Sequence, residues 1–171
     1  MPAFQSSSRI SVYLSMPTGE ISTRDIVGQA IDMGKQVFVP YIGNVKDPKS
    51  GRQAMDMLAL HSRTDLDGLQ PDGWGIPTLS GSSVQHRENG LGGVGISVDD
   101  GPEVDGFKGL DLVLIPGLGF DIFDGRLGHG KGFYDQFLER YSQRVGQEGG
   151  PVAMPLLGML FLLFPLRRDT L

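Results

Sequence analysis

The sequence has 171 residues, enough for one domain with a hydrophobic core and too few for two ordinary ones. A formal net charge of −5 argues against general nucleic-acid binding, for which a basic surface is the usual footprint. The chain contains no cysteine, so disulfides, thiolate nucleophiles and cysteine metal sites are excluded. We therefore expect a single domain over residues 1–171, and the acidic charge does not argue against an anionic small ligand, which a local positive pocket can bind.

The first part of the chain predicts a strand, a helix and a second strand. Apolar residues alternate along residues 9–16, which indicates a strand. Residues 26, 27, 30 and 31 are apolar at helical spacing, and Gly34 stands where a helix would end. A second strand is expected over residues 36–39. A βαβ unit of this length implies two parallel strands with a right-handed crossover.

The middle of the chain predicts one strand among irregular segments. Residues 43–51 are polar and are expected to form a loop, whereas residues 55–60 alternate as a strand whose methionines fill the core. Residues 71–77 are irregular and hold the only tryptophan, Trp74. Its indole can either stack on a flat ligand or pin the loop to the core. Residues 80–106 are rich in Gly, Ser, Asp and Glu, and we expect them to form a mobile insertion.

The stretch 110–141 carries the clearest structural pattern. The unbroken apolar run 112–115 is typical of a strand buried on both faces, and we expect it to end at Pro116. From Phe133 onwards, aromatic and aliphatic residues recur every three or four positions, which predicts a helix with one apolar face. Asp135 would lie in the first turn of that helix, near the positive end of its dipole.

The loop between this strand and this helix is rich in glycine and positive charge. It contains Gly125, Arg126, Gly128, His129, Gly130, Lys131 and Gly132. Backbone amides in such a loop can turn toward one anion while the cations neutralise it, so a phosphate site is one interpretation. A flexible loop with solvated charges is the other. Residues 125–131 also match the spacing G-x-x-x-x-G-K, but Gly132 replaces the Ser or Thr that a P-loop needs for magnesium.

The order of these elements predicts an α/β fold: three layers, a mostly parallel sheet with helices on both faces, Rossmann-like in arrangement. Ligands of such sheets bind beyond the carboxyl ends of the strands. The loops after Leu14, Val39 and Ile115 should therefore share one rim, with Glu20 and Tyr41 near the glycine-rich loop. From the residues alone, an ordinary solvated loop carboxylate is the favoured explanation of Glu20.

Both ends of the chain carry further signals. Residues 1–8 lack the basic start and apolar core of a signal peptide, so we expect a cytoplasmic protein. Residues 151–166 are all apolar, glycine or proline, which is shorter than a comfortable membrane span of roughly 20 residues. A buried terminal strand is the simplest interpretation, and no membrane association is expected.

Residues 115–121 followed by residues 125–135 resemble the signature of the 5-formyltetrahydrofolate cyclo-ligase family, also known as methenyltetrahydrofolate synthetases. The resemblance covers residues 9–157. It omits the family's first helix, which carries Lys and Arg for ATP, and a later acidic metal ligand. It therefore implies a truncated chain with an atypical tail over residues 158–171.

The resemblance implies ATP- and Mg²⁺-dependent cyclisation of 5-formyltetrahydrofolate to 5,10-methenyltetrahydrofolate, with release of ADP and phosphate, by a monomeric enzyme. The residues implied to contact ATP are Arg126, Leu127, Gly128, His129, Gly130, Lys131, Gly132, Phe133 and Tyr134. Arg126 and Lys131 would act in catalysis and Asp135 would bind Mg²⁺. The folate would contact Leu14, Glu20 and Trp74.

Two other functions are compatible with the residues. The first is a truncated, non-catalytic variant of the family that binds folate or nucleotide. The second is an unrelated phosphotransferase with a P-loop-like site, against which Gly132 is the main objection.

Overall fold

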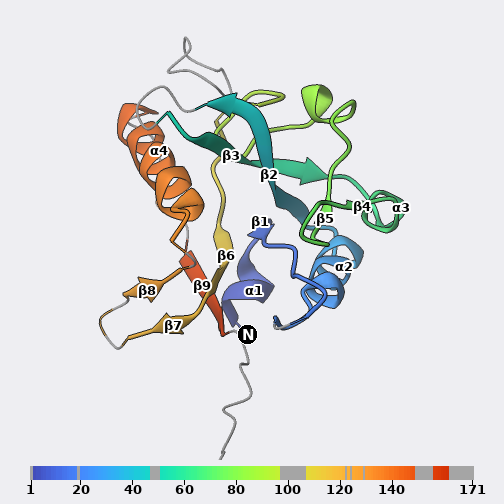
Figure 1. Ribbon diagram of the computed structural model, residues 1–171, viewed down its shortest axis with the longest axis horizontal. Helices are drawn as coiled ribbons and strands as arrows, with labels where there is room; N and C mark the ends of the chain where they lie inside the picture. Colours follow the sequence, from blue (N-terminus) through green and yellow to red (C-terminus); the bar gives the residue numbers. More distant parts are fainter. Residues whose placement is uncertain are drawn as a thin grey trace, which may run out of the picture.

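The computed structural model describes residues 2–18, 20–46, 51–96, 107–121, 123, 125–128, 130–148 and 156–161. At its centre lies a five-stranded sheet in the order β3-β2-β1-β6-β9 (Figure 1). Its strands are β1 (Arg9–Val12), β2 (Gln36–Lys46), β3 (Gln53–Leu60), β6 (Leu112–Gly117) and β9 (Leu156–Phe161). Strands β2, β1, β6 and β9 are parallel, and β3 pairs antiparallel with β2 at one edge. The predicted mostly parallel sheet is confirmed.

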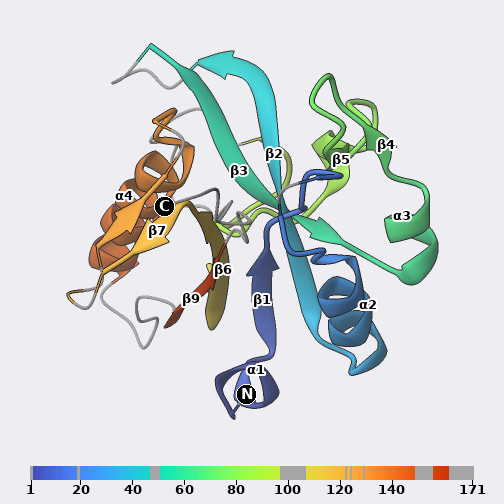
Figure 2. The ribbon, with the colours of Figure 1, turned by 60° about the horizontal axis from the view of Figure 1, so that its bottom comes forward.

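Helices lie on both faces of this sheet. The helices are α1 (Pro2–Ser6), α2 (Arg24–Asp32), α3 (Arg63–Asp67) and α4 (Phe133–Glu148). Figure 2 shows α2 and α4 on opposite sides of the strands. The short α1 carries no basic residue. Within the described residues, no helix is both long and apolar enough to cross a bilayer.

The alternation of side chains along β6 explains the three layers. Leu112 and Leu114 pack into one core cluster with Val27 and Ala30 of α2. Val113 and Ile115 point the other way and pack into a second cluster with residues of α4. Successive side chains of a strand point to opposite faces, so a continuous apolar run needs a cover on both sides. This confirms the predicted α/β fold.

The predicted βαβ unit is present as β1, α2 and β2, but each strand ends at a different residue from the one expected. β1 ends at Val12 rather than residue 16, because the backbone amide of Ser15 donates to the hydroxyl of Thr23 instead of to a neighbouring strand. Gly34 has a φ of 72°, the left-handed conformation that favours glycine after a helix. The predicted helix end is therefore confirmed.

β2 extends to Lys46, so the expected loop beginning at Gly43 was wrong for its first four residues. Antiparallel pairing with β3 extends the strand, from Val37 opposite Leu60 to Lys46 opposite Gln53. Polar residues are tolerated there because Asn44 and Lys46 are exposed.

The segment expected as an insertion contributes to the core in its described half, residues 80–96. Val84 and Leu91 are buried, and Asn89 forms an isolated β-bridge with Leu58 of β3. Arg87 donates hydrogen bonds to both carboxylate oxygens of Asp65. Residues 97–106 lie outside the described part of the chain.

The expected terminal strand is present as β9, which pairs parallel with β6 from Leu156 opposite Leu112 to Phe161 opposite Gly117. The first residues of the predicted tail, 158–161, therefore continue the central sheet. Residues 162–171 lie outside the described part of the chain.

Candidate functional site

The predicted rim forms where β1 and β6 end. After β1, residues 13–18 and Glu20 lead toward α2, and after β6 the chain enters a small hairpin before the glycine-rich loop and α4. Tyr41 does not belong to this rim, because β2 does not end at Val39 and Tyr41 pairs with Asp56 inside the sheet.

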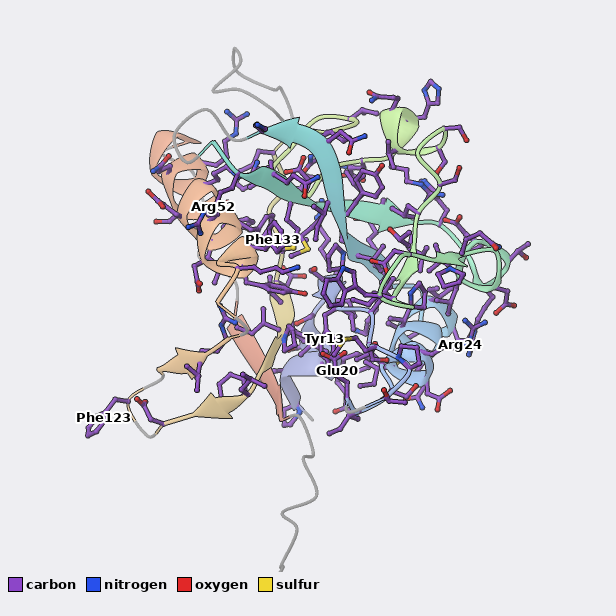
Figure 3. The ribbon with its side chains drawn as sticks, in the orientation of Figure 1. Tyr13, Glu20, Arg24, Arg52, Phe123 and Phe133 are labelled. Atoms are coloured by element: carbon purple, nitrogen blue, oxygen red, sulfur yellow. The ribbon has the colours of Figure 1, made fainter. Side chains whose placement is uncertain are left out.

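The hairpin was not anticipated from the sequence. It consists of β7 (Gly119–Phe120) and β8 (Arg126–Leu127), joined by a turn in which Asp121 accepts hydrogen bonds from the backbone amides of Phe123 and Gly125, both at 2.8 Å. Figure 3 shows Phe123 at the tip, pointing away from the body, and its side chain is 83% exposed. Two-residue strands give no periodicity, so only the Asp121 turn could have indicated this hairpin.

Arg126 lies beneath the glycine-rich loop. Its guanidinium donates to a carboxylate oxygen of Asp135 at 2.5 Å and to the carbonyl oxygen of Pro116 at 3.3 Å. Its Cζ atom lies 5.8 Å from the ring centre of Tyr134. A Cβ atom on Gly128 would lie 2.6 Å from Nη1 of Arg126, so a larger residue at that position would have to displace the end of this arginine side chain. The pairing holds the first turn of α4 to β8.

Lys131 and Trp74 come together from distant parts of the chain. The Nζ atom of Lys131 lies 4.5 Å from the centre of the Trp74 ring system. The indole is 70% exposed, so the interpretation that it pins its loop to the core was wrong. The backbone at Gly75, next to Trp74, holds this loop against the chain after β1 instead. Gly75 has a φ of 79°, and a Cβ atom there would lie 2.9 Å from Cγ of Pro17.

Two tyrosines and one carboxylate form the inner part of the site. Glu20 accepts a hydrogen bond of 2.6 Å from the backbone amide of Met16, so it is more than a freely solvated carboxylate. Burial, reinforced by the charge of Glu20, raises the pKa of Tyr13 to about 12. The same two causes, in the same order, raise the pKa of Tyr134 well above its ordinary value. Both phenols stay protonated at neutral pH, as ordinary tyrosines do, and can donate hydrogen bonds. Figure 3 shows Tyr13 beside Glu20.

Arg52 is a cation of this region that the sequence did not single out. Its Nη1 atom lies 3.8 Å from where a Cβ atom of Gly132 would stand, at the start of α4. Figure 3 shows Arg52 alongside α4. An isolated arginine before a strand carries no local signal, because the β2–β3 pairing is what brings it to the helix. The N-terminus of a helix attracts anions, and Arg52 adds to that attraction.

The other predicted site residues lie as follows. Gly130, with a φ of 82°, and Gly132, with a φ of 70°, both adopt the left-handed conformation on either side of Lys131. Leu127 is exposed and Phe133 is partly buried against the α4 face of the sheet. Leu14 is buried in the core on the α2 face, directly after Tyr13. His129 lies outside the described residues.

Asp135 is the one predicted metal ligand, and its side chain is 70% exposed. The described residues contain no cluster of three or more His, Cys, Asp or Glu able to hold a metal ion. A single accessible carboxylate fits Mg²⁺, which proteins commonly bind through one or two carboxylates together with substrate phosphates. The donor set is thus compatible with a magnesium ion that a nucleotide brings with it.

Comparison with known proteins gives a consistent result. The model of the 5-formyltetrahydrofolate cyclo-ligase family matches residues 1–159. A probable 5-formyltetrahydrofolate cyclo-ligase of Caenorhabditis elegans is 36% identical over 140 residues, which are 81% of this chain and 56% of that protein. The 5-formyltetrahydrofolate cyclo-ligase of Mus musculus is 33% identical over 153 residues, 90% of this chain and 63% of that protein. The chain thus spans less than two thirds of the length of either relative.

One solved structure shares the fold. The NMR structure of Aquifex aeolicus 5,10-methenyltetrahydrofolate synthetase matches with a TM-score of 0.56 and 21% sequence identity. The match covers 100% of this chain and 67% of that one. At this identity the likeness bears on the architecture alone.

Proposed function

Because the chain belongs to the 5-formyltetrahydrofolate cyclo-ligase family, we propose that it converts 5-formyltetrahydrofolate to 5,10-methenyltetrahydrofolate at the expense of ATP, with Mg²⁺, releasing ADP and phosphate. One observation carries this proposal beyond the family assignment. The fold brings Lys131 of the glycine-rich loop into contact with the exposed Trp74 ring, so a candidate phosphate site adjoins a candidate stacking surface.

The chemistry requires that the formyl oxygen become a leaving group. Transfer of the γ-phosphoryl group of ATP to that oxygen makes the formyl carbon electrophilic. The folate's own N10 then attacks this carbon, the ring closes, and the C–O bond breaks to release phosphate. The protein has to position two substrates and neutralise phosphate charge, and no protein nucleophile is needed.

The nucleotide would occupy the glycine-rich loop and the N-terminus of α4. Lys131, which directly precedes Gly132 in the chain, and Arg52, which lies near Gly132, would supply positive charge there. Arg126 is mostly buried and paired with Asp135, so it would support the loop from below and reach only a phosphate that enters deeply. Backbone amides around Gly130 and Gly132 would donate to phosphate oxygens.

Asp135 would hold Mg²⁺ from the first turn of α4. The ion would neutralise charge on the phosphate oxygens during transfer. Because this carboxylate already accepts a hydrogen bond from Arg126, it is oriented toward the loop before any ligand binds.

The folate would lie between Glu20 and Trp74. Trp74 offers an exposed aromatic face for the flat pterin. The carboxylate of Glu20 can accept hydrogen bonds from pterin N–H groups, and the protonated hydroxyls of Tyr13 and Tyr134 lie in the same electrostatic environment. Leu14 is buried in the core, so its role would be to hold the loop that carries Glu20 in place.

The test is absorbance at the methenyl product's band, measured with purified protein, 5-formyltetrahydrofolate, Mg²⁺ and ATP. We expect product only when ATP and Mg²⁺ are both present. A folded protein that binds both substrates without turnover would favour a non-catalytic folate- and nucleotide-binding variant. A folded protein that binds neither would contradict both functions.

A further inference from the structure

The contact between Lys131 and Trp74 joins two residues that the proposed function assigns to different substrates. Lys131 is a candidate phosphate ligand and Trp74 a candidate pterin-stacking surface. In the structure the ammonium of Lys131 lies over the ring, 4.5 Å from its centre. An ammonium at that distance occupies the space in which a flat ring would stack on the same face of the indole.

Phosphate and indole therefore compete for Lys131. A cation–π contact with an exposed ring is weak, whereas a hydrogen bond between an ammonium and a phosphate is charge-assisted and stronger. We propose that Lys131 covers the Trp74 ring until nucleotide phosphates draw it away, so that bound ATP raises the affinity for folate. This inference rests on the proposed function and concerns how its two substrates communicate.

The neighbouring backbone indicates which partner moves. Trp74 lies in a turn held by Asp72, whose carboxylate accepts hydrogen bonds from the backbone amides of Trp74 and Ile76 at 2.8 and 2.9 Å. Gly75 packs against Pro17 and fixes that turn to the loop after β1. Lys131 instead has a long flexible side chain and lies between Gly130 and Gly132. The lysine is thus the part able to change position at low energetic cost.

The size of the effect follows from the strength of the contact that is lost. An exposed cation–π contact changes an equilibrium by a factor of roughly two to five. Saturating nucleotide should therefore raise folate affinity by roughly two- to fivefold. Coupling between two binding sites is reciprocal, so saturating folate should raise nucleotide affinity by the same factor.

The experiment is titration calorimetry of the full chain with 5-formyltetrahydrofolate, with and without a saturating non-hydrolysable ATP analogue and Mg²⁺, followed by the reverse titration. Trp74 is the only tryptophan, so its fluorescence reports directly on the same contact. We expect the nucleotide analogue alone to change this emission. For Lys131→Ala without nucleotide, we expect folate affinity to rise to the value of the wild type with nucleotide, and the coupling to disappear.

Arg52→Ala is the matched control, because Arg52 also lies near Gly132 but is not the cation over the Trp74 ring. It should weaken nucleotide binding yet keep the coupling at saturation, and it should not raise folate affinity. Equal folate affinities with and without nucleotide in the wild type, or an unchanged folate affinity in Lys131→Ala, would overturn the inference while leaving the proposed function intact. A folded protein that binds neither substrate would instead contradict the proposed function, and this inference with it.

Discussion

The guanidinium of Arg126 donates a hydrogen bond of 2.5 Å to the carboxylate of Asp135, which joins the strand before the glycine-rich loop to the helix after it. Arg126 is 12% exposed and Asp135 is 70% exposed, so the carboxylate is the accessible member of the pair. A divalent cation can thus approach Asp135 from solvent without first displacing the arginine from its contact with the carbonyl of Pro116.

We expect Asp135→Asn to remove most of the Mg²⁺ dependence of nucleotide binding. The amide keeps an oxygen for Arg126 but loses the charge that holds the ion. Nucleotide affinity in the presence of Mg²⁺ should fall by roughly ten- to a hundredfold, because charge-assisted contacts are worth about 1.5–3 kcal/mol, while affinity without Mg²⁺ should change little. Calorimetric titration with and without Mg²⁺ measures both values. Equal losses under the two conditions would argue that Asp135 acts only on the loop.

Arg52→Ala should weaken ATP binding by roughly two- to tenfold, because the side chain adds positive charge at the start of α4. The loss should be larger at low ionic strength, where surface charges are screened less. Titrations at two salt concentrations provide the measurement. The control is Arg63→Ala: Arg63 pairs with Asp32 at the end of α2, by the amino ends of the strands and away from the rim. Similar effects of both substitutions would refute the assignment of Arg52.

Arg140 and Asp56 form an ion pair that joins α4 to β3, in addition to the apolar packing of Phe137 and Tyr141. Asp56 is 0% exposed and lies 3.0 Å from the guanidinium of Arg140, which also donates to the carbonyl of Met55. Arg140→Ala should lower the free energy of unfolding by about 3 kcal/mol, because a buried charge loses its counter-ion. Urea unfolding measures this change. Arg140→Lys, which retains the charge and an aliphatic stem, should lose less, and an equal loss would point to the hydrogen-bond geometry of the guanidinium, including its contact with the carbonyl of Met55, as the source.

The pair of Arg87 and Asp65 should make stability depend on pH. The two hydrogen bonds from Arg87 hold the pKa of Asp65 below its ordinary value. The unfolded chain therefore binds this proton more tightly than the folded one. The stabilisation is complete above the ordinary aspartate pKa of about 3.9 and is lost as the pH falls through the lowered value.

Asp65→Asn should consequently be less stable than the wild type near neutral pH by about 1.5 kcal/mol. The difference should shrink as the pH falls below about 4. Urea unfolding of both proteins from about pH 7, where the stabilisation is complete, down to about pH 2, below the lowered pKa window, is the measurement. A difference that stays constant over this range would show that the ion pair is not its source.

Much of the architecture was predictable because its signals are local. The apolar run 112–115 predicted a doubly covered strand, and both faces of β6 are indeed packed. The spacing of aromatic residues after Phe133 predicted α4. The longer β2 and the packing of residues 80–96 were missed, because both depend on pairing with β3 rather than on their own sequence.

The sequence by itself determined the class of fold, the family and the identity of the glycine-rich loop, because periodicity, glycine spacing and the ordered signature are properties of neighbouring residues. Only the tertiary structure decided that Lys131 lies on Trp74 and that Arg52 lies beside Gly132. These contacts join segments more than fifty residues apart in the chain. They follow from strand order and register, which determine the loops that meet at the rim, and no local pattern encodes them.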